Sequence, residues 1–450
     1  MRHTFMQRFN RLTPFQVIAG YYFLAVSFST IILSLPFARR EGMEWSLLDA
    51  VFTAVSAVSV TGLTTVSIVD TFTVPGYFLL MFVLQFGGIG IMTLGTFFWM
   101  LFGKKIGLKE RRLMMADQNQ VNLSGVVNLL KQILVIILVI ELIGALILGT
   151  YFLRYYDGVA VAFLQGLFMS VSATTNGGFD ITGNSLQDFS TDYFVQFINI
   201  LLISLGAIGF PVLIEVKEFL KRREGQPFRF SLFTKLTTTT FAALLVVGTL
   251  MILLLESRAY LKGLPWHEAF FYAFFQSATT RSGGLATLDV SQFTEATHLF
   301  MSALMFIGAS PSSVGGGIRT TTFALCLIFL FHFAKGSKSI KLFKREVYTE
   351  DIYRAVAVFI VAVFIFFASV LILSITEDQP LVALIFEVAS AFGTTGLTLG
   401  ITPDLSVIGK ILIMLLMFIG RVGLLSFLFA LGGNDKKLKY SYPKERVIIG

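Results

Sequence analysis

The chain has 450 residues, of which 55% are hydrophobic and 14% charged, and its mean hydropathy is +0.79. Soluble domains carry about 25% charged residues, so this composition excludes an ordinary soluble globule. The formal net charge is +8, which in a soluble protein would suggest a nucleic-acid partner. The basic residues gather mainly in alternate loops, however, so we predict no nucleic-acid binding.

The first long apolar run covers residues 15–35, and a run of about 20 residues is what a helix needs to cross a bilayer. It ends at Pro36 without a cleavage pattern of small residues, so we interpret it as a retained span and not as a signal peptide. Comparable runs follow at 133–153 and 356–375. We therefore expect a multi-pass protein of the cell inner membrane or plasma membrane.

The loops alternate between basic and non-basic along the chain. The basic groups occupy residues 2–11, 104–131, 217–235, 335–354 and 436–446. All five lie on one side if each interval between them crosses the membrane an even number of times. The positive-inside rule makes that side cytoplasmic and predicts that both termini are cytoplasmic. The same groups are suited to binding anionic membrane lipids.

Residue types that commonly perform catalysis are scattered along the chain. Cys326 is the single cysteine, so neither a disulfide framework nor a cysteine metal site is expected. The four histidines lack metal-ligand spacing, and Glu256, Glu268 and Glu387 have no partner that spacing would predict. The sequence therefore predicts that the protein is not an enzyme and has no cofactor.

A gapless pattern, Ser-Ala-x-x-x-x-Gly, occurs four times at near-constant spacing. Its serines are Ser56, Ser172, Ser277 and Ser390. A single pair of small residues would mean nothing in a membrane protein. Four copies in the same hydropathy context indicate an internal repeat.

Each copy lies in the same order of parts: a long span, a polar turn, a short apolar stretch, a polar strip and a second long span. The short stretches cannot cross a bilayer as helices and suit re-entrant segments; they are residues 46–56, 159–171, 266–276 and 380–389. The second spans are expected at 76–102, 194–214, 298–333 and 407–431. The chain should therefore have eight long spans.

The predicted fold class is an all-α polytopic membrane protein with four fused span–pore-loop–span repeats around one pseudo-four-fold pore. The repeats are predicted at 12–103, 128–220, 234–334 and 353–432, followed by a cytoplasmic tail at 433–450. The third repeat is expected to have a broken last span.

The polar strips are rich in glycine and threonine. Irregular backbone at membrane depth is tolerated where it is buried in protein or lines a water-filled cavity. Four strips on one axis would form a ring of carbonyl oxygens that replaces the hydration shell of a cation, and glycine permits the dihedral angles that this requires. The predicted filter residues are Val60, Thr61, Gly62, Asn176, Gly177, Gly178, Ser282, Gly283, Thr394, Thr395 and Gly396.

The strips and their order resemble the Trk/Ktr/HKT superfamily of potassium transporters over residues 12–432, and the short tail is most similar to the bacterial Ktr type. The resemblance implies that the filter glycines are Gly62, Gly178, Gly283 and Gly396. Plant relatives that favour sodium have serine where this chain has Gly62, so the resemblance implies potassium as the transported ion, with sodium dependence possible.

The register of two strips is ambiguous, because Gly177 and Gly178 are adjacent, and so are Gly283 and Gly284. The gapless pattern and the following Phe179 favour Gly178. In the third repeat the apolar residue is displaced to Leu285, so that strip is expected to differ in shape.

Two arginines lie in unusual positions, and ionisable residues inside a membrane are usually functional. Arg421 lies mid-span, where the resemblance implies a cation that projects below the filter as an electrostatic barrier. Arg281 lies within the third strip, where a bracing role and a direct effect on permeation are equally plausible. Glycines such as Gly90 and Gly209 are interpreted as close-packing positions between helices.

The last span of the third repeat is interrupted by a stretch that no continuous helix survives, because it holds Pro311 and three successive glycines. An exposed loop would reverse the side of the later basic groups. We therefore predict an intramembrane loop, at 308–317, which the resemblance identifies as a gate. The predicted gate residues are Gly308, Ala309, Ser310, Pro311, Ser312, Ser313, Gly315, Gly316, Gly317 and Arg421.

Three further hypotheses remain open: a sodium or other monovalent cation transporter of the same fold, a rocking secondary transporter, and a polytopic enzyme. Rocking transporters usually have inverted repeats, whereas these four repeats share one orientation. An enzyme would need a cluster of reactive side chains, and the sequence shows none. The resemblance also implies a homodimer and a cytoplasmic ring of nucleotide-binding regulatory subunits of the KtrA/KtrC type.

Overall fold

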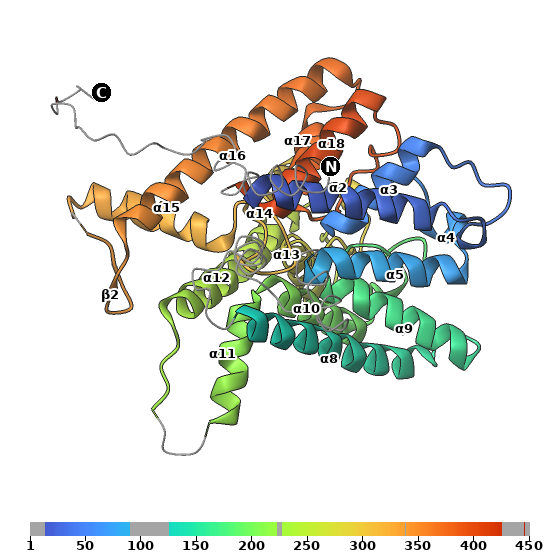
Figure 1. The fold of residues 1–450 in the computed structure, drawn as a ribbon, viewed down its shortest axis with the longest axis horizontal. Helices are drawn as coiled ribbons and strands as arrows, with labels where there is room; N and C mark the ends of the chain where they lie inside the picture. The colour runs from blue at the N-terminus through green and yellow to red at the C-terminus, as the bar shows by residue number, and fades with distance from the viewer. Residues whose placement is uncertain (1–13, 91–125, 223–226, 338, 425–444, 446–450) are drawn as a thin grey trace, which may run out of the picture.

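The structure is a computed structural model that describes residues 14–90, 126–222, 227–337, 339–424 and 445 (Figure 1). The basic segment at 104–125 and almost all of the tail predicted at 433–450 lie outside the described residues. Parts of the first and fourth predicted repeats, at 12–13, 91–103 and 425–432, also lie outside them.

Four long helices begin the four units. They are α2 (Pro14–Leu33), α8 (Val126–Phe152), α12 (Leu232–Glu256) and α16 (Thr349–Thr376). All four are long and apolar enough to cross a membrane. Large apolar side chains remain exposed on them, including Phe23 at 70%, Leu250 at 60% and Phe364 at 75%, as expected for a surface that contacts lipid.

A short helix follows each long one, as the short apolar stretches predict. These helices are α3 (Leu47–Ser59), α9 (Val159–Thr174), α13 (Trp266–Thr279) and α17 (Leu381–Gly393). The start of α3 is fixed by a capping box, in which Ser46 and Asp49 each bond to the other's backbone N–H. All four end where a polar strip begins.

The second spans differ from the prediction. They contain α5 (Val74–Ile89), α10 (Tyr193–Ala207) with α11 (Phe210–Lys221), α14 (Glu295–Ile307) with α15 (Thr320–Ala334), and α18 (Val407–Val422). The continuous span expected at 194–214 is wrong, because α10 and α11 are bent by 103°. The break expected in the third repeat is present, between α14 and α15. By length and composition, the described helices give four spans, or five if the bent pair counts as one.

The connecting segments are short. They hold α4 (Ile68–Thr71), the 3-10 turns η1 (Pro36–Ala38), η2 (Gln187–Phe189) and η3 (Val290–Gln292), and a two-stranded hairpin of β1 (Lys341–Leu342) and β2 (Arg345–Glu346). The hairpin is antiparallel, with Lys341 opposite Glu346.

The four units pack in a closed ring. The second helix of each unit contacts the short helix of the next: α5 with α9, α10 with α13, α14 with α17, and α18 with α3. The last of these contacts joins the two ends of the chain, and Figure 1 shows the red α18 beside the blue α3. The short helices and the strips that follow them are therefore held at the centre of the molecule.

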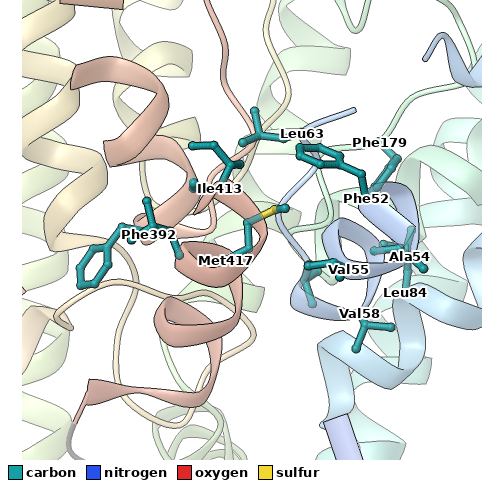
Figure 2. Close-up of a cluster of buried hydrophobic side chains, with 14 of the residues drawn as sticks. Phe52, Ala54, Val55, Val58, Leu63, Leu84, Phe179, Phe392, Ile413 and Met417 are labelled. Atoms are coloured by element: carbon teal, nitrogen blue, oxygen red, sulfur yellow. The ribbon is translucent and has the colours of Figure 1, made fainter. Parts of the chain in front are cut away.

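The main hydrophobic core lies at this junction (Figure 2). Ile413 and Met417 of α18 lie on the side that faces Phe52 of α3, and all three side chains are fully buried. Burying a large apolar side chain contributes about 1.5–3 kcal/mol. The core therefore fixes the first and fourth strips relative to one another.

Candidate functional site: four strips and a buried loop

The strips share one backbone conformation. Each contains a left-handed residue, at Val60 (φ 55°), Asn176 (53°), Ser282 (72°) or Thr394 (46°). Two positions later comes a glycine, also with positive φ, at Gly62 (97°), Gly178 (68°), Gly284 (73°) or Gly396 (93°). The middle residues are Thr61, Gly177, Gly283 and Thr395. The same pair of unusual dihedral angles thus recurs once in each unit.

This pattern corrects the predicted register in the third unit. The residue equivalent to Gly62 is Gly284, and not Gly283, which lacks a positive φ. A Cβ at Gly283 would meet Thr279 Cα at 2.9 Å and the side chain of Ile203 at 3.0 Å, away from the other strips. Counted from the repeated serine, the left-handed residue of the third unit comes one position later than in the other units, and the displaced Leu285 was the signal of this shift in the sequence.

The four glycines contact one another around the ring. A Cβ at Gly62 would lie 2.7 Å from Gly177 O, and one at Gly178 would lie 3.0 Å from Gly284 Cα. A Cβ at Gly284 would lie 2.4 Å from Thr395 O, and one at Gly396 would lie 2.1 Å from Thr61 O. A side chain at Gly62, Gly284 or Gly396 would therefore overlap the neighbouring backbone, and one at Gly178 would press tightly against it.

Hydroxyl groups at the ends of the short helices hold the strips. Ser56 Oγ accepts from Gly62 N–H at 3.1 Å, and Ser390 Oγ accepts from Gly396 N–H at 3.0 Å. Ser172 Oγ donates to Phe179 O at 2.6 Å. In the third unit Thr279 Oγ1 takes this role and donates to Leu285 O at 2.6 Å. Three of the four repeated serines therefore support the strips, a role that spacing alone did not assign.

The segment predicted as the gate loop, 308–317, forms a buried loop between α14 and α15. Ala309 N–H donates to Gly316 O at 3.1 Å and Arg319 N–H donates to Ile307 O at 3.0 Å, so the neck of the loop is closed by backbone hydrogen bonds. From Gly308 to Ile318 every residue is buried except Pro311, which is half-buried. This arrangement agrees with a loop inside the protein and not with an exposed connection.

The loop fills the break of the second unit. Ser310 N–H donates to Ala207 O at 3.0 Å, and Phe210 N–H donates to Ser312 O at 2.8 Å. Gly316 N–H donates to Ser282 Oγ at 3.1 Å, and the same hydroxyl donates to Gly393 O at 2.6 Å. One hydroxyl group thus joins the loop to the strips of the third and fourth units.

Arg421 lies against the loop. Its Nη1 donates to Val314 O at 2.8 Å and to Ser313 O at 3.3 Å, and its Nη2 donates to Gly87 O. The side chain therefore ties the loop to the first unit. A guanidinium also places a fixed positive charge beside the loop.

Sequence reasoning missed Arg319, at the end of the loop. Its Nη1 donates to Gly315 O and its Nη2 to Arg421 O, the latter at 3.4 Å. The available signal was a second cation in an apolar segment, directly after the three glycines at 315–317. The two guanidinium groups together bind three successive loop carbonyls.

Arg281 is fully buried between a strip and α14. Its Nη2 donates to Leu304 O at 2.9 Å and to Thr280 Oγ1 at 3.4 Å. Both partners belong to the protein framework, so the contacts favour a bracing role over a direct effect on permeation.

The glycines of the second spans have two different roles. Gly87 and Gly206 are close-packing positions, because a Cβ there would lie 2.6 Å from Val58 O and 2.2 Å from Thr174 O respectively. Gly90 and Gly209, in contrast, have φ of 96° and 103°. The packing interpretation therefore misses their main role: Gly90 ends α5, and Gly209 separates α10 from α11.

Buried carboxylates have hydroxyl partners that spacing did not reveal. Glu256 Oε1 accepts from Thr294 Oγ1 at 2.8 Å and also from Thr297. Glu387 Oε2 accepts from Thr398 Oγ1 at 2.8 Å, and its other oxygen accepts from Thr402. Within the described residues, no group of three or more potential ligands could hold a metal ion. These acids anchor loops to helices.

Replacing Ser282 with alanine is expected to raise potassium leak several-fold, because the change leaves the buried Gly316 N–H without its partner, at a cost of about 1–3 kcal/mol. Potassium release from loaded liposomes measures the leak. Ser302→Ala is the matched control, since Ser302 is a buried serine that bonds to His298 O within α14. Equal leak in the two variants would contradict a link between loop and strip.

Comparisons with known proteins agree with this architecture. Residues 3–433 match the TrkH family, described as cation transport protein. The chain is 59% identical to the Ktr system potassium uptake protein D of Bacillus subtilis, over 100% of both chains. It is 34% identical to the potassium/sodium uptake protein NtpJ of Enterococcus hirae, over 98% of both.

A solved structure shares the fold. The crystal structure of the potassium transporter TrkH from Vibrio parahaemolyticus matches with a TM-score of 0.71 at 20% identity, and the match covers 92% of this chain and 84% of that one. The predicted polytopic helical fold is confirmed by this likeness. Because the family match covers nearly the whole chain and the Bacillus relative aligns from end to end, this multi-pass membrane protein belongs to the TrkH family of cation transport proteins.

Proposed function

We propose that the chain is the ion-conducting subunit of a Ktr-type system that takes up potassium across the cell membrane. The observation that carries the proposal is the closed ring of Gly62, Gly178, Gly284 and Gly396, each with positive φ and each against its neighbour. Two close relatives are potassium or potassium/sodium uptake proteins by name, which supports the same cargo here.

The ring acts as a selectivity filter. Backbone carbonyls of Thr61, Gly177 and Thr395 lie against the ring glycines of neighbouring strips. Such carbonyls replace water around a potassium ion as it enters. The close contact between strips fixes the spacing of these oxygens and hence the preferred ion.

The loop at 308–317 acts as the gate. Its hydrogen bond to Ser282 puts it directly against the filter strip, and Arg421 holds it there. In this position the loop blocks the path, and the Arg421 charge opposes the passage of a cation. Opening requires the loop to leave both partners.

The assembly is a homodimer whose cytoplasmic face carries a ring of nucleotide-binding regulatory subunits of the KtrA/KtrC type. The basic loop that includes Lys335 and Arg354 faces the cytoplasm, with both termini, by the positive-inside rule. Those regulatory subunits supply the response to nucleotides, and anionic lipids bind to the same basic face.

Sodium is the alternative cargo, and the 34% identity to the potassium/sodium uptake protein NtpJ favours it specifically. Sodium also serves as a possible coupling ion for potassium uptake. A rocking transporter is less well supported, because the four strips form one fixed ring.

Uptake of potassium and sodium into transport-deficient cells, with and without Gly62→Ser, tests the proposal. A serine Cβ would lie 2.7 Å from Gly177 O, so the ring must widen and the potassium preference is expected to fall about tenfold or more. Uptake that is saturable and unaffected by the exchange would overturn the filter and favour a rocking mechanism. A wild-type preference for sodium would make sodium the cargo.

A further inference from the structure

In all four units a helix of the second span ends or begins at an equivalent residue, and these residues have nearly the same backbone angles. The values of φ and ψ are 96° and 134° at Gly90, 103° and 132° at Gly209, and 91° and 137° at Gly423. In the third unit they are 82° and 141°, and the residue is Arg319. Glycine stands at three of these positions, and arginine stands at the fourth.

The conformation at Arg319 is strained. This region of backbone angles is essentially restricted to glycine, and other residues persist there when their surroundings hold them. The backbone of Arg319 is held on both sides: its N–H donates to Ile307 O at 3.0 Å, and its carbonyl accepts from Phe323 N–H at 3.1 Å. These bonds fix the start of α15 against the end of α14.

The side chain adds a second constraint. Nη1 of Arg319 donates to Gly315 O inside the loop, and Nη2 donates to Arg421 O. Hydrogen bonds from a guanidinium are stronger than neutral ones. The arginine therefore folds back onto the loop that precedes it and holds the loop in place.

Space for movement lies next to this residue. A cavity of about 270 Å³ is bordered by Arg319, Ile318 and Pro311, by side chains of α12, α15 and α16, and by the segment just after α18. Pro311 and Gly317 of the loop form part of its wall.

We propose that Arg319 is a positioning residue of the gate that acts in two opposite ways. Its guanidinium keeps the loop closed, while its strained backbone favours release, because the residue can then return to the helical region and extend α15. The proposal rests on the gate role proposed above for 308–317. An arginine at the break makes the third unit the one that can move, whereas the glycine breaks of the other units carry no strain.

Two substitutions separate the side chain from the backbone. Arg319→Ala removes the guanidinium and keeps the strain, so potassium leak from loaded liposomes is expected to rise about tenfold, as expected for the loss of a charged hydrogen bond. Arg319→Gly removes both the guanidinium and the backbone strain. Glycine also disfavours the extension of α15 by another helical residue. The leak of this variant is expected to exceed the wild-type value but to remain several-fold below that of Arg319→Ala. Arg319→Lys keeps a charged donor and is expected to leak less than either.

Two controls accompany the series. Arg258→Ala changes an exposed arginine in the loop after α12 and is expected to leak like the wild type. Deletion of 310–315 removes the loop and is expected to leak more than any point variant. Size-exclusion chromatography establishes that each variant is folded, and if Arg319→Ala does not fold, the Gly and Lys variants are compared with wild type.

The outcomes distinguish the two proposals. If deletion of 310–315 leaves the leak unchanged, the gate role itself fails. If the deletion raises the leak while Arg319→Gly leaks as much as Arg319→Ala, the strain has no role and the inference is overturned. The inference is also overturned if Arg319→Ala and Arg319→Gly both leak like the wild type. The same holds if the leak of Arg319→Gly does not exceed that of Arg319→Lys.

Discussion

Gly284→Ala is expected to abolish potassium selectivity, whereas Gly283→Ala is expected to retain it. A Cβ at Gly284 would lie 2.4 Å from Thr395 O and 2.6 Å from Gly178 Cα, at a φ of 73°. The positive φ alone costs about 1–3 kcal/mol in a residue with a side chain, and the backbone contacts must also move apart. The ratio of potassium to sodium uptake into liposomes measures the effect.

Gly283→Ala is the matched comparison. Its Cβ would press on Thr279 and Ile203, outside the ring, so the variant is expected to be less stable but to keep the wild-type ion ratio. Both proteins are compared as folded material, at equal amounts. Loss of selectivity in Gly283→Ala alone would restore the register that the gapless sequence pattern indicates.

Removing the gate is expected to produce the second large effect. Deletion of 310–315 should raise potassium leak by about two orders of magnitude, because the segment that fills the break of the second unit is lost. Arg421→Ala should raise it about 10- to 100-fold. The substitution removes hydrogen bonds to Ser313 O, Val314 O and Gly87 O, and each bond from a charged group contributes about 1.5–3 kcal/mol.

Lys410→Ala provides the comparison for Arg421→Ala, because Lys410 lies on the same helix, α18, one turn from its start. Its leak is expected to match the wild type. Arg421 has two proposed roles, a hydrogen-bonded tether of the loop and an electrostatic barrier. Measuring the leak at several ionic strengths separates them, because only the barrier depends on the charge of Arg421. Salt screens a buried charge less than an exposed one. Unchanged or reduced flux in both the deletion and Arg421→Ala would refute the gate and its barrier.

The repeats and three of the four ring glycines could be predicted from the sequence, because their conformation requires glycine. Gly62, Gly178 and Gly396 have positive φ, and no other residue type fits so close to a neighbouring backbone. The loop was also predictable, since proline and successive glycines cannot continue a helix. In each case the residue type itself carries the structural information.

The remaining features could not be read from residue types. The register of the third strip is shifted by one position, and the displaced Leu285 indicated a change in that strip without identifying which of the two glycines joins the ring. Gly90 and Gly209 suit both a packed helix and a broken one, and tertiary contacts such as that between Gly209 and the loop decide between them. Arg319 adopts backbone angles that a residue with a side chain disfavours, so its conformation follows from tertiary contacts and not from its residue type.

The contact between α18 and α3 has a consequence for biogenesis. Arg421 and the carbonyl of Gly87 are 334 positions apart, and the ring glycines at either end of the chain meet across a similar interval. Contacts this distant in sequence form late, because the intervening chain must be ordered first. A nascent chain with three inserted units has an open side and no complete ring. The ring of four strips is therefore complete only after the last unit has been synthesised and docked against the first.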